Sequence, residues 1–357
     1  MPGVRLPAEW EPQSAIMLTW PHAGTDWAHD LARTLAVFSQ IGSAISEHQV
    51  LLSVCQDSAH ETLIRRHLLQ AGAEAQQLRF AHAPSNDTWA RDHAPITTLN
   101  NGSPVLHDFV FDGWGKKFAA DLDTAINQVL HQQGVFGNAA MQQHALVLEG
   151  GAIETDGHGT LLATRSSVLD PVRNPQIDAI QVEQMLHETL GMERFLWLDH
   201  GELSGDDTDA HIDILARFVD PNTIVYSSAP AGDADHAALQ AMFEQLQSFA
   251  DIEGQPYQLR PLPFPGPLHD PDGRRLSAGY ANFLITNRAV LLPVFGVKAD
   301  AEAVELMKDC FPTRSVVPVD CRPLIEQNGS LHCLTMQFPA AMTITSSNVK
   351  QDRHDST

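Results

Sequence analysis

Apolar residues recur along the chain with two different periods, and these periods predict alternating helices and strands. Apolar positions three and four residues apart, together with helix-end signals, predict helices at 30–48, 58–72, 121–133, 181–190, 235–249 and 300–310. Between the helices lie short β-branched runs bounded by turn residues, which predict the strands VLLSV, QLRFAH, HALVLE, RFLWL, YQLRPL and SVVPVD. Helices that alternate with strands are typical of an α/β protein.

A second pattern, a strand followed by a short turn and another strand, repeats between these elements. Four segments predict such hairpins, with turns at NNGS, DGHG, DPNT and TNRA. A fifth run, LHCLTMQF, has no neighbouring partner, and the N-terminal run SAIMLTW is able to pair with it and close a ring. Five copies of helix, strand, loop and hairpin predict one closed pseudo-symmetric domain over 1–343, followed by a polar tail at 344–357.

Composition and charge exclude several classes of protein. The 357 residues include 22 Lys and Arg against 44 Asp and Glu, and the net charge of −22 argues against nucleic acid or an anionic membrane as partner. No apolar run approaches the ~18 residues of a membrane span, and the start, MPGVRLPAEWEPQ, lacks the apolar segment of a signal peptide. The four cysteines show no paired spacing, which fits a reducing cytoplasm.

Chemically reactive side chains lie just before or at the start of the predicted hairpins. They are Asp92, Glu149, His211, Asp213, Asn282 and Cys333. In a closed ring such corresponding positions converge on one cavity, where a thiol, an imidazole, an amide and carboxylates would form a nucleophilic site. Taken alone, Cys333 is equally a small buried apolar residue. We expect it in a strand, so that the neighbouring His332 faces away and cannot serve as its base.

The segment GDDTDAHID, residues 205–213, is the densest group of polar residues and includes Asp207. In extended backbone, which the following apolar run favours, His211 and Asp213 share a face. The imidazole is then suited to general acid–base catalysis and the carboxylate to holding a cation. An oxygen-preferring metal site and a solvated acidic loop are the alternatives. Glu149, before two glycines, either orients His211 or only ends a strand.

A tryptophan lies beside two carboxylates in NDTWARDHAPI, which contains Asp87, Trp89, Arg91 and Asp92. An aromatic face next to carboxylates suits a planar cation, through cation–π attraction and bidentate hydrogen bonds. The alternative is a local pair between Asp92 and Arg91, with Trp89 in the core. Trp20 is a further candidate for the mouth of the pocket, although large aromatic residues are usually core.

With these residues, the chain resembles the family of agmatine deiminases and bacterial-type peptidylarginine deiminases. The resemblance covers nearly the whole chain and rests on PAEWEPQ, TWPHAGTDW, NDTWARDHAP, FDGWGKKF, LEGGAIETDGHGT, RNP, GDDTDAHID, LPVFG and SLHCLTMQFP. It implies the pentein fold, a five-fold pseudo-symmetric α/β propeller. It also implies Cys333 as nucleophile, His211 as general acid and base, Asp92 and Asp213 as guanidinium clamps, Glu149 as the carboxylate beside the histidine, and Asn282 near the site. Ala210 replaces the glycine of the family's TDGH, and Asn328-Gly329-Ser330 stands where glycines often precede the family's HC element.

The resemblance implies hydrolysis of a small cationic guanidino substrate through a covalent amidino-cysteine intermediate, without a metal or organic cofactor. We expect agmatine, converted to N-carbamoylputrescine and ammonia on the way to putrescine and polyamines, in the cytoplasm. Lys116 and Lys117 in GWGKKF keep a carboxylate-bearing substrate open, which gives peptidyl-arginine or free-arginine deimination to citrulline as the alternative. A non-catalytic binding protein for cationic amines, a metal-dependent hydrolase or an amidinotransferase would use the same residues differently. A homodimer is compatible with this interpretation.

Overall fold

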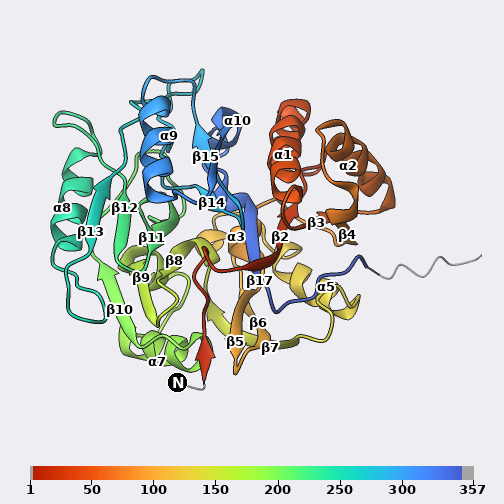
Figure 1. The fold of residues 1–357 in the computed structure, drawn as a ribbon, viewed down its shortest axis with the longest axis horizontal. Helices are drawn as coiled ribbons and strands as arrows, with labels where there is room; N and C mark the ends of the chain where they lie inside the picture. Colours follow the sequence, from red (N-terminus) through yellow and green to blue (C-terminus); the bar gives the residue numbers. More distant parts are fainter. Residues whose placement is uncertain (1–2, 348–357) are drawn as a thin grey trace, which may run out of the picture.

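The computed structural model describes residues 3–347, which form five small β-sheets with helices around them (Figure 1). One three-strand pattern occurs in all five sheets: two antiparallel strands, and a third strand that runs parallel to the second. In each copy an α-helix connects the second strand to the third. The predicted fivefold repeat of hairpin, helix and strand is therefore confirmed. No closed sheet joins these copies within residues 3–347, because the strands form five separate sheets.

In spatial order, the strands of the first sheet are β1 (Val4–Arg5), β5 (Ile96–Asn100), β6 (Ser103–Val110) and β7 (Ala140–Val147). The next three sheets are β10 (Arg194–Leu198), β9 (Thr160–Thr164) and β8 (Ile153–Thr155); β11 (Ala216–Asp220), β12 (Thr223–Tyr226) and β13 (Gln258–Pro261); and β14 (Leu284–Ile285), β15 (Ala289–Val294) and β16 (Ser315–Asp320). The fifth is β17 (Thr335–Pro339), β2 (Gln13–Thr19), β3 (Val50–Cys55) and β4 (Leu78–His82).

The fifth sheet joins the two ends of the chain. Its strands β17 and β2 pair antiparallel, with Thr335 opposite Leu18 and Phe338 opposite Ala15. This pairing confirms that LHCLTMQF finds its partner in SAIMLTW. It places the segment that carries Cys333 in the centre of the molecule rather than on a free C-terminal arm (Figure 1).

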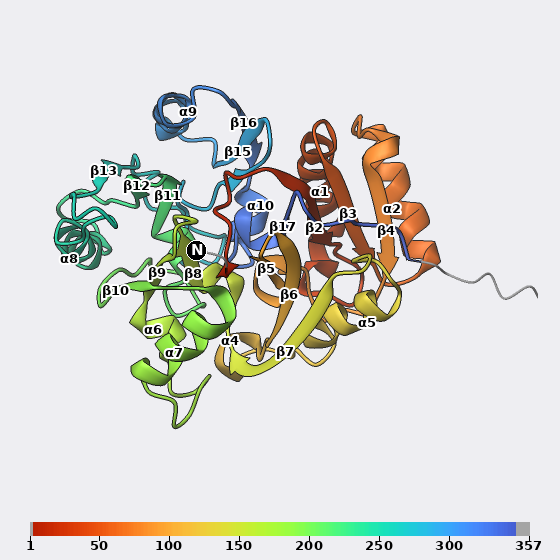
Figure 2. The ribbon, with the colours of Figure 1, turned by 60° about the horizontal axis from the view of Figure 1, so that its bottom comes forward.

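Helices cover the outside of the sheets, as both views of the ribbon show (Figures 1 and 2). The five connecting helices are α1 (Leu31–Ser46), α5 (Ile126–Gln132), α7 (Ala179–Leu190), α8 (His236–Leu246) and α9 (Ala299–Cys310). The others are α2 (Ser58–Gln70) and the short α3 (Ala90–His93), α4 (Gly113–Lys116), α6 (Arg165–Val168) and α10 (Arg322–Ile325). All six predicted helices are present, with ends that differ by a few residues. None of the helices within 3–347 has the length and apolar character needed to cross a membrane.

Local sequence signals explain where α7 begins and ends. Asp178 accepts a hydrogen bond from the backbone N–H of Gln181, whose side chain bonds back to the Asp178 backbone, so a capping box satisfies two free donors at the helix start. The helix ends at Gly191, which has a φ of 73°. A Cβ at this position would lie 2.1 Å from the carbonyl oxygen of Val4, so only glycine allows strand β1 to pass this closely.

The predicted polar tail at 344–357 lies only partly within the described residues. Ile344 is 7% exposed and belongs to the apolar core beside β17. The backbone N–H of Thr345 donates to the carbonyl of Val135 at 2.9 Å, and that of Ser347 donates to Phe80 at 2.9 Å. The segment 344–347 is therefore packed on the protein, while 348–357 lies outside the described residues.

Candidate active site

The six predicted chemical residues lie buried at the centre of the structure, each 5% exposed or less. The Cys333 Sγ is 3.7 Å from Asp213 Oδ2 and 3.2 Å from Asn282 Nδ2. His211 Nδ1 is 3.7 Å from Asp92 Oδ1. Side chains from four distant parts of the sequence thus surround one small volume.

Gly151 allows this close approach. Its backbone N–H donates to Asp92 Oδ1 at 3.1 Å. A Cβ at this position would lie 2.8 Å from both Asp92 Oδ1 and His211 Nδ1, and 3.2 Å from Asp213 Oδ2. These three side chains therefore converge on a point that a glycine leaves open.

Two predictions of backbone conformation at the site are wrong. Ile212–Ile214 is a 3-10 helix, η5, so His211 and Asp213 do not share a face of a strand. His332–Leu334 is also a 3-10 helix, η6, and the strand begins only at Thr335. His332 nevertheless does not contact the thiol through its ring nitrogens. They lie 2.9 Å from Asp213 Oδ2 and 2.8 Å from Glu9 Oε2.

The thiol and the imidazole are both uncharged in the free protein. Burial raises the pKa of Cys333 well above its usual range, and the carboxylates of Asp213 and Asp92 raise it further. Burial is the main cause that lowers the pKa of His211, to about 3; Arg173 and Lys117 act in the same direction, and the charges of Asp213 and Asp209 oppose it without offsetting it. A cation that entered between the carboxylates would favour the thiolate, because it would offset their charge.

The two carboxylates nearest the thiol have pKa values shifted in opposite directions. Burial, Asp213 and Glu149 raise the pKa of Asp92 well above its usual range, even though Trp114 Nε1 donates to it at 3.0 Å. Burial also acts to raise the pKa of Asp213, but the hydrogen bond and charge of His332, together with His211 and Arg217, outweigh it, so the net shift is downward. Asp213 Oδ1 has no hydrogen-bond partner among the described residues. It is free to accept from a bound cation.

Glu149 is held by an arginine, Arg173. Arg173 donates from Nε to Glu149 Oε1 at 2.7 Å, and from Nη2 to the Thr208 carbonyl at 3.0 Å. Its Nη1 also donates to Asp209 at 2.7 Å. Arg173 therefore fixes the loop that leads to His211 against Glu149. The second oxygen of Glu149 and Nε2 of His211 both lack a partner within the described part of the chain.

A pocket with a volume of about 320 Å³ leads from the surface to Cys333. Its wall contains the aromatic residues Trp89, Trp114 and Phe118, and five aspartates: Asp26, Asp87, Asp92, Asp123 and Asp207. None of the described residues that line it is Lys, Arg or His. An acidic pocket with aromatic walls is suited to a cation.

Two of these aspartates have pKa values close to neutrality. Burial raises the pKa of Asp87 to about 7, and the nearby Asp123 carboxylate contributes. Burial likewise raises the pKa of Asp123 to about 7. The indole N–H groups of Trp27 and Trp89 donate to Asp87 at 2.8 and 2.9 Å, which fixes this carboxylate at the wall.

Three sequence-based expectations about the surroundings of the pocket are revised. Trp20 does not line it: the side chain is fully buried and its ring packs against Phe38 at 5.7 Å. Lys117 donates to the Asp207 carbonyl and to Asp209, both at 2.7 Å, and like Lys116 it lies outside the lining. Arg91 does not pair with Asp92, since its closest carboxylate is Glu9, at 4.0 Å.

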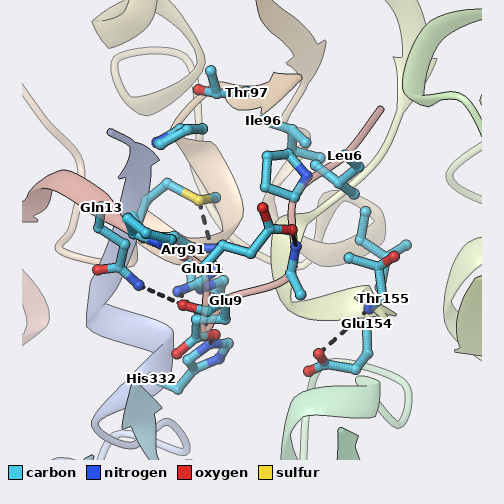
Figure 3. Close-up of a pocket in the computed structure, with 18 residues that line it drawn as sticks. Leu6, Glu9, Glu11, Gln13, Arg91, Ile96, Thr97, Glu154, Thr155 and His332 are labelled. Atoms are coloured by element: carbon cyan, nitrogen blue, oxygen red, sulfur yellow. Dashed lines mark hydrogen bonds and ion pairs between the residues drawn. The ribbon is translucent and has the colours of Figure 1, made fainter. Parts of the chain in front are cut away.

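A second, smaller cavity lies beside Arg91 and His332, and Figure 3 shows its wall. Glu9, Arg91 and Glu154 line it together with residues of the N-terminal segment such as Leu6 and Gln13. It contains neither Cys333 nor His211. It reveals contacts that the sequence did not predict, because Glu9 and His332 are 323 positions apart.

The described residues 3–347 contain no group of three or more His, Cys, Asp or Glu side chains arranged to hold a metal ion. A buried thiol beside carboxylates, reached through an acidic pocket, suits attack on a cationic carbon. Together with the fold, it defines the class of protein: a hydrolase of C–N bonds in linear amidines. A model of the family described as Porphyromonas-type peptidyl-arginine deiminase matches residues 5–339, and the chain belongs to this family.

Individual relatives agree with this assignment. The agmatine deiminase of Stutzerimonas stutzeri is 32% identical, over 95% of this chain and 96% of its own. Among solved structures, a cysteine-to-serine variant of C. jejuni agmatine deiminase with substrate bound is similar with a TM-score of 0.86 at 32% identity, covering 94% of this chain and 96% of that one. A Porphyromonas gingivalis protein, solved as a candidate arginine deiminase, has a TM-score of 0.88 at 45% identity, covering 95% and 99%.

Proposed function

We propose that this protein hydrolyses agmatine to N-carbamoylputrescine and ammonia through a covalent intermediate on Cys333. The observation that carries the proposal is the pocket that ends at the thiol: five aspartates line it and no described Lys, Arg or His does. Agmatine carries a guanidinium at one end and an ammonium at the other. A cation at each end matches carboxylates at each end of the pocket.

The guanidinium binds between Asp92 and Asp213, with its carbon over the sulfur of Cys333. Asp213 offers the free Oδ1, and Asp92 keeps acceptor capacity beyond its bonds to Gly151 and Trp114. The ammonium end lies toward Asp87, Asp123 and Asp207 near the pocket mouth. Holding both ends of the substrate keeps the reacting carbon in position for attack by the sulfur.

In the first half-reaction the Cys333 thiol loses its proton to His211 as the cation binds, and the sulfur forms a bond to the guanidinium carbon. His211 returns the proton to one nitrogen of the tetrahedral adduct, the C–N bond breaks and ammonia leaves. In the second half-reaction His211 takes a proton from water, which attacks the same carbon. The C–S bond then breaks as His211 returns this proton to the sulfur, the hydroxyl of the adduct gives its proton to the released ammonia or to solvent, and the ureido product leaves. Each step balances without an external oxidant or cofactor.

Free arginine and peptidyl-arginine remain the second candidates, because the family model and the P. gingivalis relative carry arginine in their descriptions. The α-carboxylate of free arginine would face Asp87 and Asp123. Like charges in a half-buried site repel each other. Lys117, the cation that would offset them, is already bonded to Asp209. Agmatine is therefore favoured.

The architecture and surroundings of this site belong to the same proposal. We take residues 1–343 as one catalytic domain, in which the five sheets are the blades of a five-fold pseudo-symmetric propeller of the pentein type. The five copies of one strand pattern support this arrangement. We further propose that the enzyme works in the cytoplasm without a cofactor, that neither nucleic acid nor a membrane is a partner, and that a homodimer is compatible with its surface.

A direct assay tests the proposal. Purified protein is incubated separately with agmatine, free arginine and a peptide with C-terminal arginine, and both ammonia and ureido product are measured. We expect product from agmatine with a kcat/KM well above that for either arginine compound. Preference for arginine would overturn the substrate assignment, and binding of agmatine without product would indicate a non-catalytic amine-binding protein.

A further inference from the structure

His332 lies in the wall between the active site and the second cavity, and it is 2% exposed. Its Nδ1 is 2.9 Å from Asp213 Oδ2 and its Nε2 is 2.8 Å from Glu9 Oε2. Figure 3 shows the imidazole beside Glu9. Both ring nitrogens thus face carboxylate oxygens. Each of the two contacts is a hydrogen bond only when a proton lies between the nitrogen and the oxygen, so the full set of hydrogen bonds needs two protons.

Glu9 is a rigid anchor for this imidazole. Its Oε1 accepts from the backbone N–H of Ile285 at 2.6 Å, and its Oε2 accepts from Arg217 Nη2 at 2.7 Å as well as from His332. Arg217 is itself fully buried and donates to Glu154 and to the Phe283 carbonyl. A carboxylate with this many donors has little freedom to turn.

The other end of the contact is the predicted guanidinium clamp. Asp213 Oδ2 is bonded to His332, while Oδ1 has no partner among the described residues. We propose that His332 is a positioning residue, held by Glu9, that turns the Asp213 carboxylate so that Oδ1 faces the guanidinium of the substrate. The inference rests on the proposed function, because it assigns a role in binding the same guanidinium.

The charges around His332 show what its removal would do to Asp213. Burial, Arg217 and Arg91 lower the pKa of His332, while Glu9 and Asp213 oppose them. Asp213 itself is buried, and the hydrogen bond and charge of His332 are the largest influences that lower its pKa. Without that donor, Asp213 would hold a proton in the free protein at higher pH than it does now. Binding of a guanidinium would then have to release it.

Two amides of similar size separate this role from simple packing. In His332→Asn the side-chain amide can donate where Nδ1 does, toward Asp213. In His332→Gln the longer amide reaches toward Glu9 and leaves Asp213 without its donor. Both variants are made in Cys333→Ala, which stops turnover, and agmatine binding is measured by calorimetry at pH 6 in buffers of different ionisation enthalpy. His107→Asn is the matched control, since His107 is 2% exposed and bonds to Thr98 and His144 through its two nitrogens.

We expect His332→Asn and the control to keep agmatine affinity within about threefold and to release the same number of protons as the parent. His332→Gln should lose about 10- to 100-fold in affinity, the usual effect of one hydrogen bond to a charged group, and should release an additional fraction of a proton, up to one. Equal affinity and proton release in the two amides would overturn the positioning role. If either variant does not fold, Glu9→Gln is measured instead. We expect it to lower the affinity for agmatine, by less than His332→Gln would. An unchanged affinity would contradict the proposal.

Failure of this inference is distinguishable from failure of the proposed function. The unmodified protein is assayed in parallel for release of ammonia from agmatine. No ammonia would overturn the function itself. Ammonia release together with indistinguishable amide variants would overturn only the role of His332.

Discussion

Replacing Asp87 by asparagine should lower kcat/KM for agmatine. It should leave kcat/KM nearly unchanged for pentylguanidine, an analogue without the ammonium group. Pentylguanidine has the same guanidinium, with a methyl group in place of the ammonium. Asp87 lines the pocket together with Asp123, both near the proposed ammonium position. Because the change removes one charge and keeps the size of the side chain, it tests the charge at the distal end of the pocket.

The size of the effect follows from the setting of Asp87. The Asp87 side chain is half-buried. An ion pair at such a position is stronger than one on the surface and weaker than one fully removed from water. A hydrogen bond to a charged group in such a place contributes about 1.5–3 kcal/mol, and each ~1.4 kcal/mol is a factor of ten. We therefore expect kcat/KM for agmatine to fall about 10- to 150-fold above pH 8. For pentylguanidine it should change less than about threefold.

The effect should depend on pH with a definite sign. The pKa values of Asp87 and Asp123 are both raised to about 7, so the two carboxylates are mainly neutral below that pH and ionised above it. Because kcat/KM reports the ionisation of the free enzyme, the preference for agmatine over pentylguanidine should rise from pH 6 to pH 8 and then level off. Asp87→Asn should make this rise smaller.

The assay is steady-state ammonia release with both guanidines from pH 6 to 9. Asp26→Asn is the control, since Asp26 lines the same pocket but is exposed, and its removal should change kcat/KM less than about threefold. Folding of Asp87→Asn is checked by thermal unfolding, because Trp27 and Trp89 both donate to this carboxylate. A preference that falls with pH, or an equal loss for both guanidines, would show that Asp87 does not bind the ammonium.

Three further predictions concern other residues in and around the pocket. Asp92→Asn should raise KM and lower kcat together, with at least about a hundredfold loss in kcat/KM, because the clamp acts in the ground state and the transition state; an unchanged KM in steady-state assays would contradict this. Ala210 has a φ of 67°, a conformation that costs a non-glycine residue about 1–2 kcal/mol. Ala210→Gly should therefore increase the free energy of unfolding by about 0.5–1 kcal/mol in denaturant titrations. A lower free energy of unfolding would contradict this strain. Lys117→Ala should leave KM for agmatine within about threefold, since Lys117 bonds to Asp209 outside the pocket, whereas a large increase would place this cation in the substrate site.

The sequence was sufficient to predict the elements and their repeat, because the signals for both are local. Period and turn chemistry are read over a few residues, and each of the four sequential hairpins carries its own turn. The pairing of β17 with β2 was also predictable, since LHCLTMQF was left without a neighbour. The chemical residues could be recognised because the repeat aligns their positions at the hairpin starts.

The conformation and partners of the site residues could not be predicted in the same way. His211, Asp213 and Cys333 lie in or next to single 3-10 turns that come directly before strands, and one turn is too short to leave a periodic signal. The contact between Glu9 and His332 depends on the tertiary structure, because no local pattern links residues at opposite ends of a chain. The same holds for the bond between Trp114 and Asp92, although FDGWGKKF was recognisable as a family segment.

Covalent catalysis by Cys333 is tested most sharply by trapping the adduct. Reactions with agmatine are quenched in acid within milliseconds to seconds, and the protein is digested and analysed by mass spectrometry, with Cys333→Ala in parallel. We expect a transient peptide that contains Cys333 and is heavier by the mass of agmatine minus ammonia, absent from the variant, which also releases no ammonia. Turnover by a folded Cys333→Ala protein, or an adduct on any other residue, would contradict covalent catalysis at this thiol.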